Sequence, residues 1–375
     1  MPVFLRILLA AVAIALGFIC AALQRSGFGE FVAEKSSPHP SEGFPIFKTK
    51  FLNIEQSRDL PMVHVASPVI YPGGLATVWY GGSQECAPDV KLYFSKDLDA
   101  KPCVIMTRDR AERDLDRPVQ SIGNAVLIAE PDDSLRLLFV TIGMGKWSGS
   151  QLNSSVSTDG GLTWSRAERL TLSPFFNFSE LVRNRPLPLK DGGWCVPIYQ
   201  EFLGKFPELL WLSKDGSYRK SRIAGGCTSF QPSVVPLDNR RAIALMRDYT
   251  PIHRIHLART EDGGRSWTKP SPTSLPNPDA GISAIQLPNK KILLAYNDST
   301  IDRKNLSWAL SDNDGISWKK IVSPDYGPIK SFAYPYLIGD GDSVFQAFTA
   351  NGKLIELDIF NQAFLDEETK KAPQP

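Results

Sequence analysis

Ser157-Thr-Asp-Gly-Gly-Leu-Thr-Trp164 is one of three closely similar eight-residue stretches in this 375-residue chain. The others are Thr260-Glu-Asp-Gly-Gly-Arg-Ser-Trp267 and Ser311-Asp-Asn-Asp-Gly-Ile-Ser-Trp318, and weaker relatives begin at Ser95 and Ser213. Four of the five copies follow a short apolar or alternating run, which is typical of a strand. In such a stretch the Asp or Asn side chain binds backbone amides, Gly admits a positive φ, and Trp packs on the sheet. Each copy therefore predicts a strand that enters a tight turn.

The spacing of the copies predicts the architecture. Their starting positions lie 47 to 62 residues apart, a period found in propellers and solenoids. Between about Phe47 and Phe360 there is room for about six such units. The 29 Pro and 28 Gly interrupt the chain often, and long helical periods are nearly absent. We expect a single, closed, almost entirely β domain.

The repeated turn resembles the Asp-box, S-x-D-x-G-x-[ST]-W, of the sialidase (neuraminidase) superfamily. This resemblance implies a six-bladed β-propeller in which the boxes are structural turns on blade hairpins away from the channel. The third copy has Asn313 where the motif has Asp, and Asn can make the same kind of turn bond.

The ends of the chain differ from its middle. Arg6 and Arg25 flank an apolar run over residues 7–23, which predicts a hydrophobic helix in residues 1–25, either a transmembrane anchor or a cleaved signal sequence. Both alternatives predict a propeller exported to the periplasm or the cell exterior. We expect a linker over residues 26–45, the propeller over 46–362 and a disordered tail over 363–375.

Charge and cysteine content restrict the partners. The net charge of +2 comes without a basic stripe, which argues against nucleic acid, and the membrane is expected only through the N-terminal helix of a monomer. Beyond Cys20 the chain has four cysteines, which can pair as 86–103 and 195–227 in an oxidising compartment or remain free thiols. Their spacing does not support a metal site, and no cofactor is implied.

The resemblance extends to residues that would form a sialidase site. Ser331-Phe-Ala-Tyr-Pro-Tyr-Leu337 is similar to the segment that carries the nucleophilic tyrosine, which places Tyr334 there. Arg303-Lys-Asn-Leu306 is similar to the family's R-x-N-L run, and Arg247 ends an apolar strand that resembles the one delivering another arginine. Arginine binds a sugar carboxylate through its planar fork. Tyr334 is therefore the predicted nucleophile, and Arg247 and Arg303 the predicted carboxylate-binding residues.

Two positions depart from the family pattern. Gln231 stands where a glutamate is usual, so it can orient the Tyr334 hydroxyl but cannot take its proton. His64 stands in place of the first arginine and carries a full charge only below its pKa. Both remain predicted substrate-binding residues, but a strict sialidase is not expected.

The loop that would carry the catalytic acid/base follows the segment that contains His64. Ser83-Gln-Glu-Cys-Ala-Pro-Asp-Val90 resembles the S-x-E-G-A-x-D-V signature of a subgroup of bacterial predicted neuraminidases, with Cys86 replacing Gly. We expect Glu85 to be the catalytic acid/base, with Asp89 as its partner or as a turn former. The overall resemblance covers about residues 60–350.

Three further residues are candidate substrate-binding residues, and each also has a simple structural explanation. Arg183 can face the channel or lie on an exposed loop. Glu201 can supply the carboxylate that is missing because Gln231 replaces a glutamate, or it can lie at the rim of the channel. Asn277, like Asp279 in the same Leu-Pro-Asn-Pro-Asp segment, can contact sugar hydroxyls or belong to a Pro-rich turn.

These residues favour an exported, sialidase-like glycoside hydrolase acting on an acidic sugar, either sialic acid or a uronate, in a glycan or polysaccharide. Two alternatives stay open. One is a non-catalytic propeller that binds a polysaccharide, and the other is a polysaccharide lyase.

Overall fold

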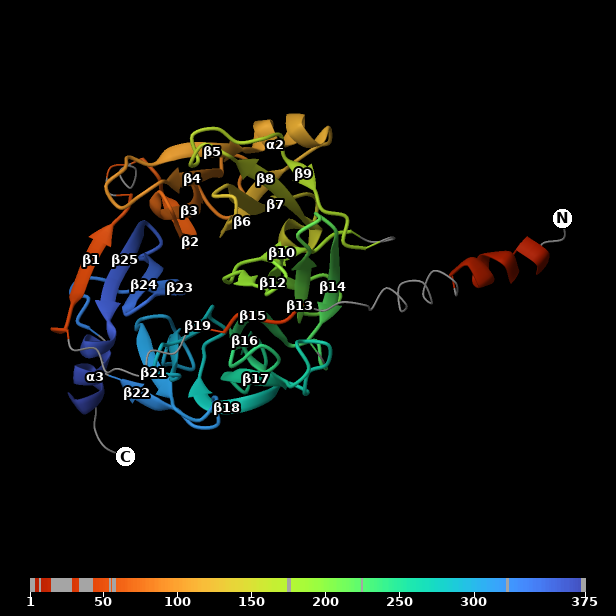
Figure 1. Cartoon of the computed structure of the whole chain (residues 1–375). Helices are drawn as coiled ribbons and strands as arrows, with labels where there is room; N and C mark the ends of the chain where they lie inside the picture. Colours follow the sequence, from red (N-terminus) through yellow and green to blue (C-terminus); the bar gives the residue numbers. More distant parts are fainter. Residues whose placement is uncertain are drawn as a thin grey trace.

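The structure is a computed structural model that describes residues 4–6, 8–14, 29–33, 43–53, 55, 59–173, 177–223, 225–321 and 324–371. Six antiparallel sheets are arranged around a common axis, and these are the blades of the expected all-β propeller (Figure 1). The first strands of the blades line the centre of the ring.

The blades follow one another in chain order. Blade 1 contains β2 Met62–Tyr71, β3 Gly74–Gly82, β4 Lys91–Ser95 and β5 Cys103–Thr107. Blade 2 contains β6 Ser121–Ala129, β7 Leu135–Ile142, β8 Ser150–Ser157 and β9 Glu168–Arg169. Blade 3 contains β10 Leu181–Val182, β11 Leu187–Pro188, β12 Trp194–Gln200, β13 Phe206–Leu212 and β14 Tyr218–Arg222. Blade 4 contains β15 Ser229–Pro236, β16 Ala242–Asp248, β17 Arg254–Thr260 and β18 Ser271–Pro276. Blade 5 contains β19 Ser283–Gln286, β20 Ile292–Tyr296, β21 Ser307–Ser311 and β22 Lys319–Ile321. Blade 6 contains β23 Phe332–Asp340, β24 Ser343–Ala350, β25 Leu354–Asn361 and β1 Phe47–Phe51. Around the centre of the ring, β2 contacts β6 and β23, β19 contacts β15 and β23, and β10 contacts β6, whereas blade 3 meets blade 4 through β12 and β15.

The ring is closed by strand β1, which comes from the beginning of the propeller. It pairs antiparallel with β25, with Phe47 opposite Phe360, and so becomes the outermost strand of blade 6. The Phe47 ring also stacks on Phe364 at 5.0 Å between centroids. Joining the two ends of the domain in one sheet covers the outer edge of β25, which would otherwise be unpaired.

The Asp-boxes form the turns that their sequences predict. The three full copies connect β8 to β9, β17 to β18, and β21 to β22. In the first copy Asp159 Oδ1 accepts the amide of Thr163 at 2.9 Å, and Trp164 Nε1 donates to Gly161 O at 3.1 Å. In the third copy Asn313 Oδ1 accepts the Ser317 amide at 2.9 Å, so Asn replaces Asp without loss of this bond. Strands alternate in direction, so these turns lie at the opposite end of the blades from the loops between second and third strands.

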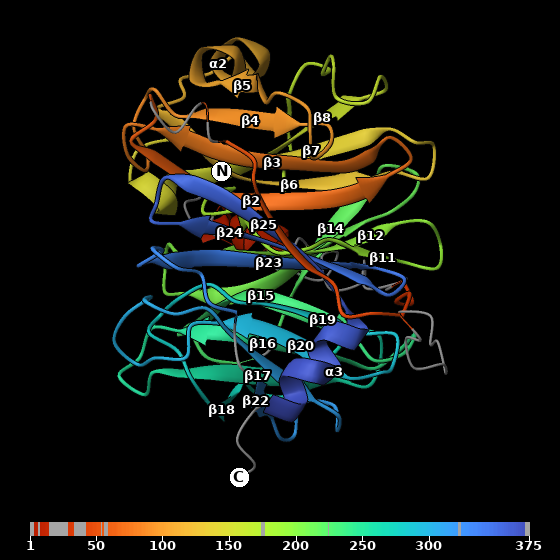
Figure 2. The same cartoon turned by 90° about the vertical axis from the view of Figure 1, so that its left-hand side faces the viewer.

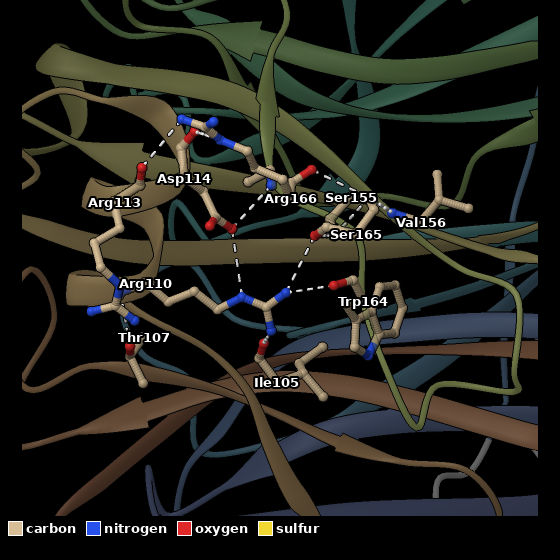
Figure 3. A network of polar contacts seen from close by, with 11 residues as sticks. Ile105, Thr107, Arg110, Arg113, Asp114, Ser155, Val156, Trp164, Ser165 and Arg166 are labelled. Atoms are coloured by element: carbon tan, nitrogen blue, oxygen red, sulfur yellow. Dashed lines mark hydrogen bonds and ion pairs between the residues drawn. The ribbon is translucent and has the colours of Figure 1, made fainter.

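The short helix α2 (Arg108–Leu115) ties blade 1 to the first Asp-box (Figure 3). The Arg110 guanidinium donates to the carbonyl oxygens of Ile105 at 2.9 Å and Trp164 at 2.7 Å. Asp114 accepts the Ala167 amide at 3.0 Å. The sequence reading did not identify this helix, because eight residues are too few to establish a helical period.

Part of the expected 26–45 linker is packed on the propeller. Phe31 is fully buried among residues of blades 3 and 4, with 6.0 Å between its ring and that of Trp211. Its amide donates to Asn239 O at 3.0 Å, and it forms an isolated bridge with Leu189. The expectation of a linker was wrong for residues 29–33, because one aromatic side chain fills the space between two blades.

The expected tail also begins as ordered structure. Helix α3 (Gln362–Lys371), drawn in Figure 2, lies against β22 and β25. Leu365 on this helix is fully buried. Asn361 Oδ1 accepts the Phe364 amide at 3.1 Å and caps the helix. The prediction of disorder from residue 363 was therefore wrong through residue 371, whereas residues 372–375 lie outside the described residues.

The N-terminal prediction concerns residues that are described only in part. Residues 4–6 and 8–14 are helical, while Cys20, Ala22 and the rest of the apolar run lie outside the described residues. Among the described residues there is no helix with the length and apolar character needed to span a bilayer. Cys86, Cys103, Cys195 and Cys227 are free thiols, so neither pairing considered from the sequence is formed.

Blade 6 buries two carboxyl groups on one face of β25. Asp358 Oδ2 accepts from Tyr326 Oη at 2.8 Å and from Gln346 Nε2 at 3.0 Å, and its side chain is inaccessible to solvent. Burial raises the pKa of Asp358 to about 8 and that of Glu356 to about 7. The folded protein therefore retains protons that the unfolded chain has already lost above about pH 4.

We expect the free energy of unfolding to fall as pH rises from about 4 to 8, because ionising a buried carboxyl group costs folding energy. Asp358 contributes a slope of up to about 1.4 kcal/mol per pH unit in this range. Asp358→Asn should flatten the pH dependence measured by urea unfolding, whereas Asp312→Asn in an exposed turn should leave it unchanged. Equal slopes in wild type and Asp358→Asn would contradict this account.

Candidate functional site

The predicted site residues come from five blades and gather at one end of the channel. His64 lies in the first half of β2, Gln231 in that of β15 and Tyr334 in that of β23. Arg247 is near the end of β16, and Glu201 directly follows β12. Glu85 and Arg303 belong to the loops β3–β4 and β20–β21. Starts of first strands, ends of second strands and the loops that follow them all lie at the end opposite the Asp-boxes.

Backbone irregularities position several of these side chains. Gln231, Asp279 and Tyr334 have left-handed φ values of 53°, 54° and 56°. The pairing register shifts beside Gln231 in β15 and beside Tyr334 in β23, as it does after His64 in β2. Such bulges redirect a side chain that a regular strand would place on a blade face. Left-handed non-glycine residues are uncommon and cluster at functional sites.

Tyr334 lies among three of the other candidates. Its ring makes an edge contact with the His64 ring at 5.3 Å between centroids. The guanidinium carbons of Arg183 and Arg303 lie 5.4 and 5.6 Å from its ring centroid. The structure thus brings Tyr334, Arg303 and His64 together, although they are distant in sequence.

Glu85 lies next to His64. Its Oε1 is 3.7 Å from His64 Nε2 and accepts from Tyr80 Oη at 3.3 Å. Burial lowers the pKa of His64, Glu85 opposes this shift, and Arg303 adds to it. The imidazole is therefore neutral at pH 7 and does not provide a third positive charge for a carboxylate.

Asp89 serves the loop that carries Glu85. Its two carboxylate oxygens accept from the Ser83 amide at 2.9 Å and the Ser83 hydroxyl at 2.8 Å. Of the two roles considered for Asp89, these bonds match that of the turn former.

Arg247 makes bonds that the sequence did not predict. Its Nε donates to Asp279 Oδ1 at 2.8 Å, its Nη2 donates to Asp279 O, and its Nη1 donates to Gln231 Oε1 at 3.1 Å. Arg303 Nη2 donates to the same Asp279 carbonyl at 2.9 Å. Asp279 thus joins the two predicted carboxylate-binding arginines.

Gln231 contacts a different tyrosine from the expected one. Its Nε2 donates to Tyr199 Oη at 3.0 Å, and Asn124 Nδ2 donates to the same oxygen at 3.0 Å. With its amide held between Arg247 and Tyr199, Gln231 does not orient the Tyr334 hydroxyl. This expectation was wrong, because the sequence did not reveal that β12 places Tyr199 within reach.

Arg183 lies beneath Tyr334 and is only 1% exposed. Its Nη1 donates to Ile282 O at 2.6 Å and its Nη2 to Pro335 O at 2.7 Å, so it joins blade 3 to blades 5 and 6. Burial lowers the pKa of Arg183 to about 10, so it stays protonated at pH 7. Arg183 is thus not on an exposed loop. It reaches from blade 3 to residues of blades 5 and 6 and lies beside Tyr334, which agrees with the alternative that it faces the channel.

Glu201 and Asn277 have different surroundings. Glu201 Oε2 is 3.5 Å from Lys205 Nζ, and burial raises the pKa of Glu201 while Lys205 and Arg247 oppose the shift. Glu201 therefore lies within the electrostatic reach of the arginine site.

Asn277 is fully buried and binds Ala280 through both amide atoms, at 2.8 and 3.1 Å. Its side chain closes the turn that carries Asp279, which matches the turn alternative.

Sequence reasoning missed Asp279 as the counterion of Arg247, and Tyr80, Tyr199 and Lys205 as neighbours of the site. Lys205 Nζ lies over the rings of Phe230 at 4.3 Å and Tyr249 at 5.1 Å. Only Asp279 carried a signal, a polar residue in a Pro-rich turn. Among the described residues, no group of three or more His, Cys, Asp or Glu side chains could hold a metal ion.

A family comparison agrees with this architecture. The model of the BNR repeat-like domain family matches residues 73–347, most of the propeller. The chain belongs to this family. No curated protein matches the BNR repeat-like chain by sequence.

Solved structures show the same fold at low sequence identity. The Hadza microbial sialidase Hz136 superposes with a TM-score of 0.69 at 17% identity, over 83% of this chain and 68% of that one. A protein of unknown function from Dyadobacter fermentans gives a TM-score of 0.66 at 14% identity, over 85% and 100%. The intramolecular trans-sialidase from Ruminococcus gnavus gives 0.61 at 13%, over 84% and 96%. This BNR repeat-like protein therefore has the six-bladed sialidase fold.

Proposed function

We propose that this chain is an exported, sialidase-like glycoside hydrolase acting on an acidic sugar, sialic acid or a uronate, in a glycan or polysaccharide. The observation that carries the proposal is the convergence of Tyr334, Arg303 and Arg247 at one channel end, with His64 beside Tyr334 and Glu85 beside His64. The S-x-E-C-A-x-D-V loop supports it through its resemblance to bacterial predicted neuraminidases. Export rests on the apolar N-terminal run.

In this proposal the sugar carboxylate binds the arginines, because a guanidinium fork matches a carboxylate in shape and charge. Tyr334 lies below the anomeric carbon, where it attacks as a nucleophile or stabilises the developing positive charge. Glu85 gives its proton to the leaving oxygen as the glycosidic bond breaks. Water then gives a proton to the Glu85 carboxylate and bonds to the anomeric carbon, and in the nucleophilic variant this displaces Tyr334, which recovers its proton. Neutral His64, whose ring centroid lies 5.3 Å from that of Tyr334, is the proposed acceptor of the tyrosine proton in the nucleophilic variant.

A non-catalytic, polysaccharide-binding propeller is the second candidate. Gln231, which stands where sialidases have a glutamate, binds Arg247 and Tyr199 and cannot serve as a base at Tyr334. This observation favours binding without turnover.

The test uses the purified full-length chain with a panel of sialosides and uronate oligosaccharides. New reducing ends report hydrolysis, and ultraviolet absorbance reports an unsaturated lyase product. We expect hydrolysis of an acidic glycoside, lowered at least about a hundredfold by Glu85→Gln. Glu168→Gln, on an exposed part of β9, should leave the rate unchanged. Binding without turnover would support the second candidate, and an unsaturated product would replace both with a lyase.

A further inference from the structure

Asp279 occupies the part of Arg247 that an acidic sugar would use. A carboxylate commonly binds arginine side-on through two parallel N–H donors. In this chain Nε donates to Asp279 Oδ1 at 2.8 Å, and Nη2 donates to the carbonyl of the same residue. Nη1 donates to Gln231 at 3.1 Å. The side-on edge of Arg247 is therefore filled from within the protein.

Asp279 also lies on the solvent side of this pair. The Arg247 side chain is 8% exposed, whereas that of Asp279 is 35% exposed. A ligand entering from the channel end therefore meets the Asp279 carboxylate before it reaches Arg247. Glu201 is a second acidic neighbour, because its ionisation responds to both Arg247 and Asp279.

The backbone around Asp279 is held independently of its carboxylate. Asn277 closes the turn through its bonds to Ala280, and the Asp279 carbonyl accepts from Arg303 Nη2 at 2.9 Å. The carboxylate can therefore leave Arg247 by side-chain rotation while the turn and the carbonyl stay in place. This rotation frees Nε of Arg247 for the sugar carboxylate, whereas Nη2 keeps its bond to the Asp279 carbonyl.

We propose that Asp279 determines specificity as an internal carboxylate that competes with an acidic sugar for Arg247. This proposal rests on the function proposed above. In this proposal the sugar carboxylate first binds Arg303. It binds Arg247 only after the Asp279 side chain has rotated away from Arg247. An anion that binds beside an unmoved Asp279 would meet like-charge repulsion, whereas a neutral sugar would not.

Two substitutions remove the competing charge and tolerate the left-handed backbone at φ 54°. Asp279→Asn keeps an oxygen acceptor for Arg247, and Asp279→Gly removes the side chain altogether. The matched control is Asp302→Asn. Asp302 is 31% exposed, lies in the β20–β21 loop beside Arg303, and pairs with Lys304 at 3.1 Å. This variant removes an equal charge near the site, and the Asp302 carboxylate binds the side chain and the backbone amide of Lys304 in its own loop.

Calorimetric titration of the full-length chain measures the effect. The ligands are the methyl glycosides of N-acetylneuraminic acid and glucuronic acid, each compared with its neutral methyl ester. We expect Asp279→Asn and Asp279→Gly to bind an acid about tenfold more tightly than wild type, with ester affinity unchanged. Asp302→Asn should match wild type for all ligands.

Acid affinity that is equal in wild type and both Asp279 variants would overturn the inference and leave the proposed function standing. Weaker acid binding in both variants would also overturn it, because Asp279 would then only position Arg247. Failure of wild type and both variants to bind either acid would overturn the inference together with the proposed function.

Discussion

Tyr334→Phe is expected to lower the rate of glycoside hydrolysis at least about a hundredfold while changing the free energy of unfolding by less than about 1 kcal/mol. The substitution removes only the hydroxyl group. The ring remains in contact with His64, Arg183 and Arg303 through its edge and faces. Loss of rate with retained stability would therefore identify the hydroxyl as the reacting group.

The measurement compares kcat/KM on the best acidic glycoside with the midpoint of urea unfolding. Tyr71→Phe is the control, because it removes a hydroxyl that donates to Lys96 O at 3.3 Å on the surface of blade 1. It should leave both quantities near those of wild type. A Tyr334→Phe protein with the wild-type rate would exclude Tyr334 from the chemistry.

Arg183→Met is expected to lower the free energy of unfolding by about 3 kcal/mol or more. The guanidinium donates to Ile282 O, Pro335 O and Asn184 Oδ1, all in buried surroundings. Methionine nearly fills the space but leaves these three acceptors without their donor, and an unsatisfied buried polar group is costly. Asn184 in turn donates to the carbonyls of Gln231 and Pro232, so the change weakens the junction of blades 3, 4, 5 and 6.

Urea unfolding of Arg183→Met beside Arg113→Met on α2 measures this effect. Arg113 is exposed, and its replacement should cost less than about 0.5 kcal/mol. If Arg183→Met does not fold, Arg183→Lys tests the same claim, because lysine keeps the charge but cannot span the three acceptors. A loss below about 1 kcal/mol in either variant would show that blade packing alone holds the junction.

The fold could be predicted because its signal is local. The bonds that form the turn of an Asp-box lie within eight residues, so the sequence indicates both the turn and the preceding strand. The interchange of Asp159 and Asn313 at equivalent positions illustrates this, because both accept an amide four residues ahead at 2.9 Å. Repetition of this local signal then predicted the number of blades.

The site was predictable only in part, because its contacts depend on bulges and on long-range packing. Tyr334, Arg303 and His64 were identified from separate segments, and the structure brings them together. The partners of Gln231, Arg247 and Arg183 were not predicted. Each lies in another blade or in a left-handed turn, such as Asp279 at φ 54°, and local sequence patterns do not show where such side chains point.

The ends of the propeller were also mispredicted because local sequence patterns do not reveal long-range packing. Phe31 and Leu365 stand in short segments that were predicted to be linker and tail, but each is fully buried against the propeller. Two or three apolar residues in a short segment establish no periodicity, so the docking of these segments depends on gaps that only the folded blades create.

The most direct test of the central claim is a crystal structure of the full-length chain with an acidic methyl glycoside that it binds. The account predicts the sugar at the channel end, with its carboxylate on Arg303 and Arg247, the Asp279 carboxylate turned away from Arg247, and the Tyr334 hydroxyl facing the anomeric carbon. A sugar bound elsewhere on the propeller, or a carboxylate at this end that contacts neither arginine, would contradict the account.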